Sequence, residues 1–344
     1  MVLDSEFYDQ HEAVVFRKDT RSGLRAIIAI HNSNRGPAIG GCRFLPYRNE
    51  QDATEDVLRL SRGMTYKCAI SEIAFGGGKS VIIGDPSVEK TPAVLHAMAD
   101  FVEDLQGRYI VSFDMGTNLD DVRTMGQRTA HVGGIADGAG NASESTAEGV
   151  FVCIGAALRH RFGSDSFAGR TVAIQGVGNV GGRLAQRLAQ AGARLIVSDV
   201  SAEAAQAAAR DTAAEIVDNA MIHRVEADVF SPCARGGILN AGTIPDIEAA
   251  IVAGGANNQL STPADAQSLL ARGIVYCPDY LVNAGGIVDL YYQQPRIARS
   301  GLAAHLRRLG AILGEILARA GSEGVTPSAI CDAMAEERFQ DDRA

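Results

Sequence analysis

Residues 171–190 read TVAIQGVGNVGGRLAQRLAQ, and this stretch decides the fold of the C-terminal half of the chain. Thr171–Gln175 is a short apolar run that predicts a strand, and Val180–Gln190 predicts a helix closed by Gly192. Between them lies G-x-G-x-x-G, at residues 176–181. In a strand–turn–helix context the first glycine allows a tight turn, the second lets a pyrophosphate approach the backbone, and the third permits close helix packing.

The same pattern indicates which dinucleotide is bound. The next predicted strand, Arg194–Ser198, is followed by Asp199, close to the spacing of about 20 residues expected for an acid that binds the adenosine ribose. A carboxylate there repels a 2′-phosphate, which favours NAD over NADP. The predicted cofactor-binding residues are Gly176, Val177, Gly178, Asn179, Val180, Gly181 and Asp199. A glycine turn without a ligand is the alternative, because a glycine-rich chain produces this motif by chance.

Strands and helices alternate regularly beyond this motif. Further strands are predicted at 228–230, 250–252 and 273–276, and the alanine-rich residues 202–210 predict a helix. Such alternation is typical of a doubly wound parallel sheet, as in Rossmann-type domains. The first third is instead mixed α/β: a hairpin at 13–18 and 24–31, a helix opened by an Asp52–Glu55 capping box, strands at 80–83 and 108–113, and a helix at 92–105.

The two halves meet in a segment of small residues. Residues 133–149 read GGIADGAGNASESTAEG and predict a linker or mobile loop. We therefore expect an α/β protein of two domains. Residues 1–133 form the first domain, 134–319 form the NAD-binding domain, and a C-terminal helix at about 320–344 packs back on the first.

Composition excludes several classes of protein. The 344 residues are 46% hydrophobic and 21% charged, which is typical of a globular protein and not of a disordered one. A net charge of −9 argues against nucleic acid or anionic membrane as the main partner. No signal peptide or apolar run of about 18–20 residues is evident, and six scattered cysteines without ligand spacing predict reduced thiols and no metal site. We expect a cytoplasmic protein.

Three side chains carry the predicted chemistry. Lys79 follows three glycines and leads directly into a buried strand, where an unpaired ammonium is costly. If Lys67 shares a cleft with it, repulsion and burial lower the pKa of at least one lysine into the range useful for proton transfer. Asp114 ends an apolar strand, where acids commonly face a ligand. The alternatives are a solvated Lys67 at a helix end, and an Asp114 that forms an Asx-turn or caps the 118–122 segment.

Eight ordered motifs resemble one enzyme family. They are GPAIGGCRFLPY (36–47), LRLSRGMTYKCA (58–69), FGGGKSVIIGDP (75–86), DMGTN (114–118), QGVGNVG (175–181), PCARGGILN (232–240), GGANNQL (254–260) and PDYLVNAGG (278–286). From about residue 12 to 338 the chain resembles the leucine/phenylalanine/valine branch of the amino-acid dehydrogenases, in the glutamate dehydrogenase superfamily.

The resemblance implies a role for each matching residue. Lys67 grips the substrate α-carboxylate, Lys79 polarises the carbonyl oxygen and activates water, and Asp114 exchanges protons with the amino group. Further implied contacts are Gly40, Gly41 and Asn258 with the substrate, Arg43 with the cofactor, and Thr146, Cys233, Ala234 and Ala256 with its nicotinamide half. The implied reaction is reversible NAD-dependent oxidative deamination, in a cleft that closes between the two domains.

The substrate is expected to be an apolar L-amino acid. Ile39, Ser112, Ile287 and Leu290 fall at the implied pocket positions, and an apolar pocket excludes glutamate. Leucine and phenylalanine differ too little for the sequence to separate them, although GGCRFLPY and FGSDSFAGR (162–170) favour phenylalanine. Residues 287–294, the short loop at 133–146 and the bulky Phe113 depart from the family pattern.

Two other functions compete with this one. A hydroxy-acid dehydrogenase relies on a histidine–acid pair, whereas the histidines here lie outside the motifs. A regulatory or scaffold protein that binds NAD without turnover is compatible with the altered 287–294 segment, although Lys67, Lys79 and Asp114 are all present. The resemblance also implies a homo-oligomer, a dimer or larger, assembled through the N-terminal domain.

Overall fold

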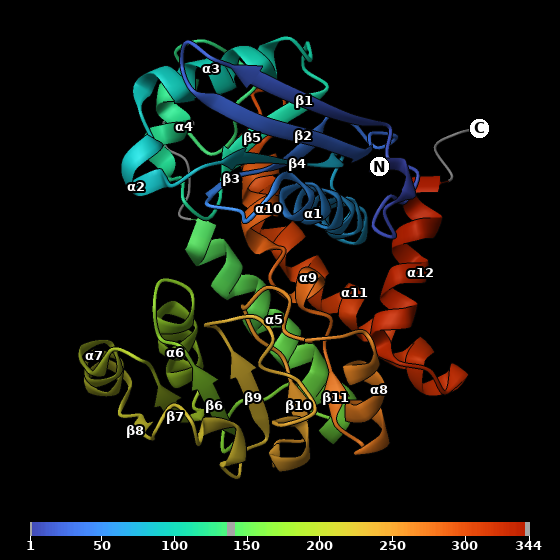
Figure 1. The fold of residues 1–344 in the computed structure, drawn as a ribbon. Coiled ribbons are helices and arrows are strands. Elements are labelled where there is room, and N and C mark those ends of the chain that lie inside the picture. The colour runs from blue at the N-terminus through green and yellow to red at the C-terminus, as the bar shows by residue number, and fades with distance from the viewer. Residues whose placement is uncertain (1, 136–141, 341–344) are drawn as a thin grey trace. The chain divides into compact units, whose positions relative to one another are not determined.

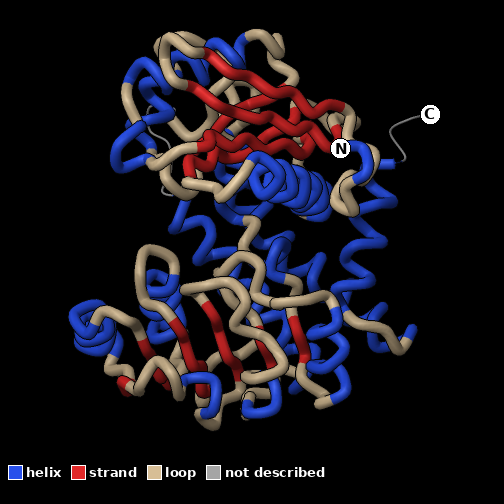
Figure 2. The backbone as a smooth tube through the Cα atoms, viewed as in Figure 1, coloured by secondary structure: helices blue, strands red, loops and turns tan. Residues whose placement is uncertain are grey.

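The computed structural model describes residues 2–135 and 142–340, and the chain forms two compact units (Figures 1 and 2). Unit 1 comprises Met1–Ala139, Gln293–Pro295 and Ala335–Ala344, and unit 2 comprises Gly140–Tyr292 and Arg296–Met334. No helix in the described ranges is long and apolar enough to cross a membrane.

Unit 1 is built on a five-stranded mixed sheet in the order β1-β2-β4-β3-β5. The strands are β1 (Ala13–Asp19), β2 (Leu24–Asn32), β3 (Ala38–Leu45), β4 (Gly76–Ile83) and β5 (Tyr109–Phe113). The predicted β1–β2 hairpin is confirmed, and β3 pairs in parallel with both β4 and β5. Because β3 is central to this parallel group, the carboxyl ends of β3, β4 and β5 lie side by side.

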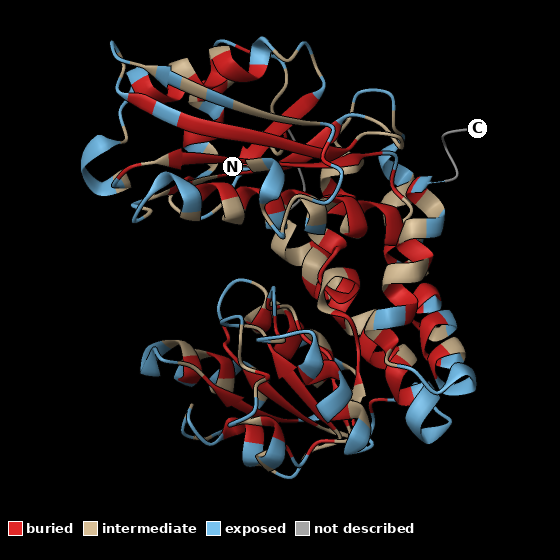
Figure 3. Cartoon of the chain, turned by 45° about the vertical axis from the view of Figure 1, so that its right-hand side comes forward, coloured by how far each residue is buried: buried red, intermediate tan, exposed pale blue. Residues whose placement is uncertain are grey.

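Helices cover both faces of this sheet (Figure 1). The alternation of β2 sends Ile27 and Ala29 toward α1 (Glu50–Ile70), and Ile28 and Ile30 toward α3 (Pro92–Glu103). Short helices α2 (Pro86–Glu89) and α4 (Leu119–Met125) and a 3-10 turn at Val2–Asp4 complete the unit, together with the end of α12 (Pro327–Gln340). The central strands are buried in Figure 3.

Two local predictions in unit 1 were wrong. The helix begins at Glu50 and not at Asp52, because the Asn49 side chain caps it by accepting the Asp52 N–H at 2.8 Å. Strand β4 begins at Gly76, four residues before the predicted start at 80. Its glycines are needed for close packing: a Cβ at Gly77 would lie 2.1 Å from the Thr65 nitrogen of α1. Because glycine has a low strand propensity, the sequence pattern predicted that the strand starts only after these glycines.

Unit 2 is built on a six-stranded, all-parallel sheet in the order β11-β10-β9-β6-β7-β8, so the predicted doubly wound fold is confirmed. The strands are β6 (Thr171–Gln175), β7 (Arg194–Ser198), β8 (Glu215–Ile216), β9 (Val229–Pro232), β10 (Ile251–Val252) and β11 (Val275–Tyr276). The order reverses between β6 and β9. The carboxyl ends of these two strands therefore form the switch point where ligands bind in such sheets.

The helices of unit 2 are α5 (Ala142–Phe162), α6 (Gly181–Gln190), α7 (Ala202–Thr212), α8 (Ala264–Ala271), α9 (Asp279–Val282), α10 (Gly285–Tyr291) and α11 (Leu302–Glu323), with most of α12. Short 3-10 turns lie at Ile222–Arg224, Ile244–Asp246 and Arg299–Gly301. The prediction of a linker over 133–149 was wrong for its second half. Residues 142–149 form the first two turns of α5, while 136–141 lie outside the described residues.

Candidate active site

Three charged side chains meet beside the carboxyl end of β5, level with Cys42 of β3 and Ser80 of β4. Lys79 comes from β4, Arg43 from β3, and Asp114 immediately follows β5. Lys79 forms an ion pair with the Asp114 Oδ2 atom, and Arg43 Nε donates to the same oxygen at 3.0 Å. The other carboxylate oxygen, Oδ1, accepts the Met115 N–H at 2.7 Å. Both oxygens of Asp114 are thus held.

Burial and charge shift the titration of this pair. Lys79 is only 6% exposed, and burial lowers the pKa of its ammonium despite the opposing attraction of Asp114. Burial alone would raise the pKa of Asp114, but Lys79 and Arg43 outweigh it and lower that pKa to about 2. Asp114 is therefore an anion at neutral pH, while the proton of Lys79 is easier to remove than that of an exposed lysine.

The capping alternative for Asp114 was wrong. Asn118 is the N-cap of α4, and Thr117 accepts the Asp114 N–H at 2.9 Å while donating to the Cys42 carbonyl at 2.7 Å. Gly116, at φ +80°, supplies the left-handed residue of the turn. The turn is therefore closed by the backbone of Asp114 and by Thr117, while the Asp114 Oδ2 atom is left to the two cations.

Lys67 lies in the last turn of α1 and is half-buried. A cation that lowers the pKa of Lys79 in the structure is Arg43, which the sequence did not indicate in that role. That Lys67 binds the substrate carboxylate stays a prediction.

The predicted substrate-binding residues of β3 and β5 lie in the sheet. A Cβ at Gly40 would be 1.9 Å from the Gly78 carbonyl oxygen, and one at Gly41 2.6 Å from that of Phe113. Both glycines are thus required for strand packing, and the Gly40 carbonyl already accepts the Tyr109 hydroxyl at 2.9 Å. Ser112 is nearly buried, and Ile39 has no exposed surface to offer a substrate in this conformation.

In unit 2 the glycine turn has the geometry that the dinucleotide motif requires. Gly176 adopts φ +88°, and a Cβ at Gly181 would lie 1.9 Å from the Gly176 carbonyl oxygen, so both positions need glycine. Gly178 is different, because nothing lies within 4 Å of an added Cβ. The middle glycine thus borders open space, as the approach of a pyrophosphate requires.

Asp199 stands beside this turn. Its Oδ2 atom accepts the Val177 N–H at 2.8 Å, and Oδ1 accepts the Ser201 N–H at 2.9 Å. Asp199 therefore braces the glycine turn as well as presenting a charge at the end of β7.

Residues after β9 and β10 complete the switch point. The Cys233 N–H donates to the Gln175 carbonyl at 2.7 Å, and Ala234 touches Gly176 closely enough to forbid a side chain there. The Ala256 N–H donates to Pro232 at 2.9 Å. Asn258 is exposed, with the rare φ of +51° for a residue other than glycine, which is common at functional sites.

The remaining predicted residues of unit 2 lie on α5 and α10. Thr146 donates to the Ala142 carbonyl within α5, and a Cβ at Gly286 of α10 would lie 3.0 Å from its Oγ1 atom. Ile287 is nearly buried in α10, whereas Leu290 is half-exposed. The structure therefore brings Thr146 next to the helix that carries the two predicted pocket residues.

Sequence reasoning missed several polar residues. Asp289, within the unusual 287–294 segment, is fully buried and accepts hydrogen bonds from Ser145 Oγ at 2.5 Å and Arg299 Nη1 at 3.0 Å. Gln259 and Asn283 both donate to the Ala256 carbonyl. Nothing in the spacing of these residues separates them from ordinary polar positions, although the departure at 287–294 did mark the region of Asp289.

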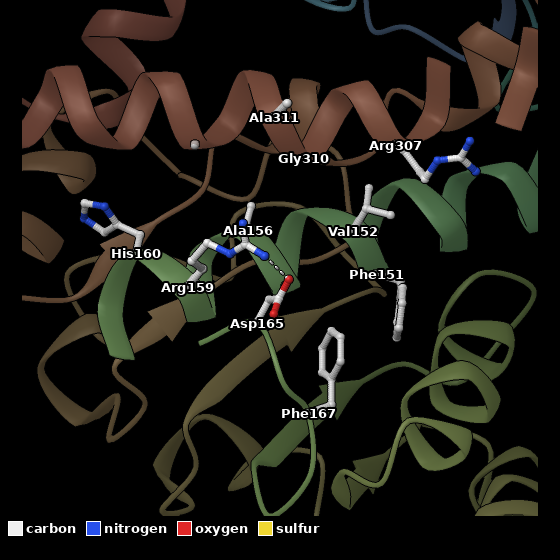
Figure 4. A pocket seen from close by; sticks show the side chains of 12 residues that line it. Phe151, Val152, Ala156, Arg159, His160, Asp165, Phe167, Arg307, Gly310 and Ala311 are labelled. Carbon is white, nitrogen blue, oxygen red and sulfur yellow. Dashed lines mark hydrogen bonds and ion pairs between the residues drawn. The ribbon is translucent and has the colours of Figure 1, made fainter. Parts of the chain in front are cut away.

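A cavity of about 540 Å³ lies elsewhere in unit 2, between α5 and α11 (Figure 4). The stacked rings of Phe151 and Phe167, 4.5 Å apart, and the small residues of both helices line it, with the Arg159–Asp165 ion pair at its polar side. None of its lining residues is a predicted site residue. Within 2–135 and 142–340, no group of three or more His, Cys, Asp or Glu side chains is arranged to hold a metal ion.

Comparison with known proteins confirms the resemblance inferred from the motifs. The family model for the Glu/Leu/Phe/Val dehydrogenase dimerisation domain matches residues 9–131. The Glutamate/Leucine/Phenylalanine/Valine dehydrogenase model matches residues 134–203 and 197–293.

Relatives match along most of their length. A leucine dehydrogenase of Geobacillus stearothermophilus is 43% identical over 97% of this chain and 92% of its own, and a phenylalanine dehydrogenase of Lysinibacillus sphaericus is 47% identical over 81% and 76%. The crystal structure of an L-tryptophan dehydrogenase from Nostoc punctiforme is 40% identical, with a TM-score of 0.88 and 97% of both chains covered. These matches do not favour the hydroxy-acid or scaffold alternatives.

Proposed function

Because the chain belongs to the Glu/Leu/Phe/Val dehydrogenase family, we propose that it catalyses the reversible NAD-dependent oxidative deamination of an apolar L-amino acid. The amino acid, NAD⁺ and water give the 2-oxo acid, ammonium, NADH and one proton. The observation that carries this proposal is the buried Lys79 paired with Asp114 and Arg43, since it supplies an acid–base lysine and an anion for an amino group.

In this proposal Lys67 and Lys79 of unit 1 have different roles in the reaction. The Gly176–Gly181 turn would hold NAD, which would supply a hydride acceptor when bound. Lys67 binds the α-carboxylate. Lys79, with its lowered pKa, takes a proton from the water that attacks the imine carbon and returns it when ammonia leaves.

Asp114 acts first as an acceptor for the substrate amino group. A carboxylate whose pKa is about 2 is a weak base, so it orients the N–H bonds while both cations occupy Oδ2. Proton exchange between Asp114 and the amino group requires one of these cations to leave or to lose its charge. Deprotonation of Lys79 supplies that change, because an arginine keeps its charge at all relevant pH values.

An apolar side-chain pocket is part of the proposal. From the family resemblance we assign Ile39, Ser112, Ile287 and Leu290 to this pocket, and Gly40, Gly41 and Asn258 to the substrate backbone. A second carboxylate would be buried there without a partner, which disfavours glutamate. The relatives are named for leucine, phenylalanine and tryptophan, which supports an apolar substrate without selecting one.

The test is NADH formation with a panel of L-amino acids: phenylalanine, leucine, valine, tryptophan and glutamate. We expect turnover with at least one apolar substrate, and a kcat/KM for glutamate at least about 100-fold lower, because its second carboxylate is left unpaired. Activity greatest with glutamate, or none with any amino acid, contradicts the proposal.

Cofactor choice is expected to depend on the charge of Asp199. The Asp199→Asn variant keeps an acceptor for the Val177 N–H but removes the charge that repels a 2′-phosphate. The ratio of kcat/KM with NAD to that with NADP is therefore expected to fall about 10-fold, a change of about 1.4 kcal/mol. Asp211→Asn, at an exposed acid of the neighbouring helix α7, is the control. An unchanged ratio in Asp199→Asn would mean that this carboxylate does not face the ribose.

The proposal extends to the assembly and the location of the protein. We infer a homo-oligomer, a dimer or larger, formed through residues 9–131, which the dimerisation-domain model matches. We place the enzyme in the cytoplasm, where its cysteines, none of which forms a disulfide in the described residues, stay reduced.

A further inference from the structure

Asp56, in the first half of α1, contacts the site of Lys79, Arg43 and Asp114 through Arg43. Its carboxylate accepts Arg43 Nη1 at 2.9 Å and 3.3 Å, the Tyr47 hydroxyl at 2.8 Å and Arg59 Nη2 at 2.9 Å. The side chains of Arg43 and Asp56 are each only 15% exposed. Arg43 therefore bridges two carboxylates, Asp56 through Nη1 and Asp114 through Nε.

We propose that Asp56 is a positioning residue for catalysis: through Arg43 it fixes the carboxylate of Asp114 against Lys79. This rests on the proposed function, because it assigns Asp56 a part in the proton transfer of that same site. Neither the sequence motifs nor the relatives' names point to Asp56.

The geometry of Arg43 is suited to this task. A guanidinium is planar and presents its donors in a fixed fork, so a carboxylate on one side determines how the other side is aimed. Lys79, on a flexible stem, contacts Asp114 with one atom and fixes no such direction. When Lys79 loses its proton during turnover, Arg43 remains the charged partner of Oδ2, and Asp56 keeps the guanidinium from turning away.

The pKa shifts of the groups around Asp56 also support its role as a positioning residue. Asp114 and Asp56 outweigh burial and raise the pKa of Arg43, which keeps the bridge charged. Burial and Asp56 raise the pKa of Tyr47, so its hydroxyl remains a donor to Asp56. Asp56 also acts on Lys79, whose pKa it raises, whereas Arg43 lowers it. Removing the charge of Asp56 should therefore lower the pKa of Lys79 further.

The decisive variant is Asp56→Asn. Oxidative deamination needs neutral Lys79, so the rate rises with pH through the Lys79 pKa. We expect the acidic limb of the kcat–pH profile to move down by about half a pH unit, as the negative charge that favours the ammonium is lost. We also expect kcat at the pH optimum to fall about 10-fold, with KM changed less than about threefold, because Asp114 is less well aimed.

Asp52→Asn is the matched control. Asp52 lies one turn earlier on α1 and pairs with the exposed Arg48, not with Arg43. The same chemical change there is expected to leave both the limb and kcat unaltered. An Asp56→Asn enzyme with an unmoved limb, or with activity lost only in proportion to loss of folded protein, overturns the proposal.

A second readout does not depend on turnover. Reductive ¹³C-methylation of the lysines allows Lys79 to be titrated by NMR, with its signal assigned by its absence in Lys79→Ala. The Lys79 titration is expected to move to lower pH in Asp56→Asn and to stay in place in Asp52→Asn. If the wild-type protein deaminates no amino acid, the proposed function fails. An Asp56→Asn protein whose Lys79 titration is unchanged overturns the coupling alone.

Discussion

Lys79→Ala is expected to lower kcat for oxidative deamination at least about 10³-fold, since a positioned acid–base group contributes roughly 10²–10⁴ and this lysine also balances the charge of Asp114. NAD affinity is expected to stay within about threefold of wild type, because Lys79 is not part of the predicted cofactor turn, Gly176–Gly181. The measurements are steady-state NADH formation and calorimetric titration with NAD.

Lys18→Ala provides the control. Lys18 is also a lysine of unit 1, but it is exposed on β1 and lies outside the charged site. Its loss is expected to change kcat less than about twofold. Added methylamine, small enough for the space left by the Lys79 side chain, is expected to restore part of the lost rate. A Lys79→Ala enzyme that keeps more than a tenth of its activity would remove Lys79 from the mechanism.

The Rossmann-type unit was predictable because its local signals agree with one another. Thr171–Gln175 and Arg194–Ser198 are strands with the predicted bounds, and the glycines between β6 and α6 have the predicted physical reasons for being glycine. Short strand–turn–helix units depend mainly on neighbouring residues. The fold class of this half could therefore be derived without knowledge of distant contacts.

The start of β4 was predicted after Gly76–Gly78, because these residues are glycine for tertiary packing and not for a local turn. They avoid side chains that would strike α1 and Tyr109, partners far along the chain, while local propensity argues against a strand. Residues 142–149 show the opposite case, since small residues typical of a linker form the start of a packed helix. There Gly149 is buried, and a Cβ would lie 3.2 Å from the Val282 carbonyl oxygen.

The candidate site was predicted in part for the same reason. Lys79, Asp114 and Arg43 fall in motifs, and the structure brings them together. Asp56 is one of several acids in the first half of α1, with Glu50, Asp52 and Glu55, and no local pattern separates it from them. Only the pairing of β3 with its neighbours and the packing of α1 show which acid faces Arg43.

Gly178→Val is expected to separate cofactor binding from folding. An added side chain meets nothing within 4 Å at its Cβ, and the residue does not need a positive φ, so Tm is expected to stay within about 2 °C of wild type. The same side chain occupies the space where the pyrophosphate approaches the backbone. The Kd for NAD is therefore expected to rise at least about 100-fold, or about 2.7 kcal/mol. Thermal unfolding and calorimetric titration measure the two effects on one protein sample.

Two further glycines make this prediction specific. Gly321→Val, on α11 and also without a neighbour within 4 Å of an added Cβ, is expected to change neither Tm nor NAD affinity appreciably. Gly181→Ala is expected to lower both, because its Cβ would lie 1.9 Å from the Gly176 carbonyl oxygen and force the helix away from the turn. If Gly178→Val binds NAD as tightly as wild type, the turn is only a connection between β6 and α6. If Gly178→Val folds normally but loses NAD binding, residue 178 is glycine because the dinucleotide occupies the space that a side chain would fill.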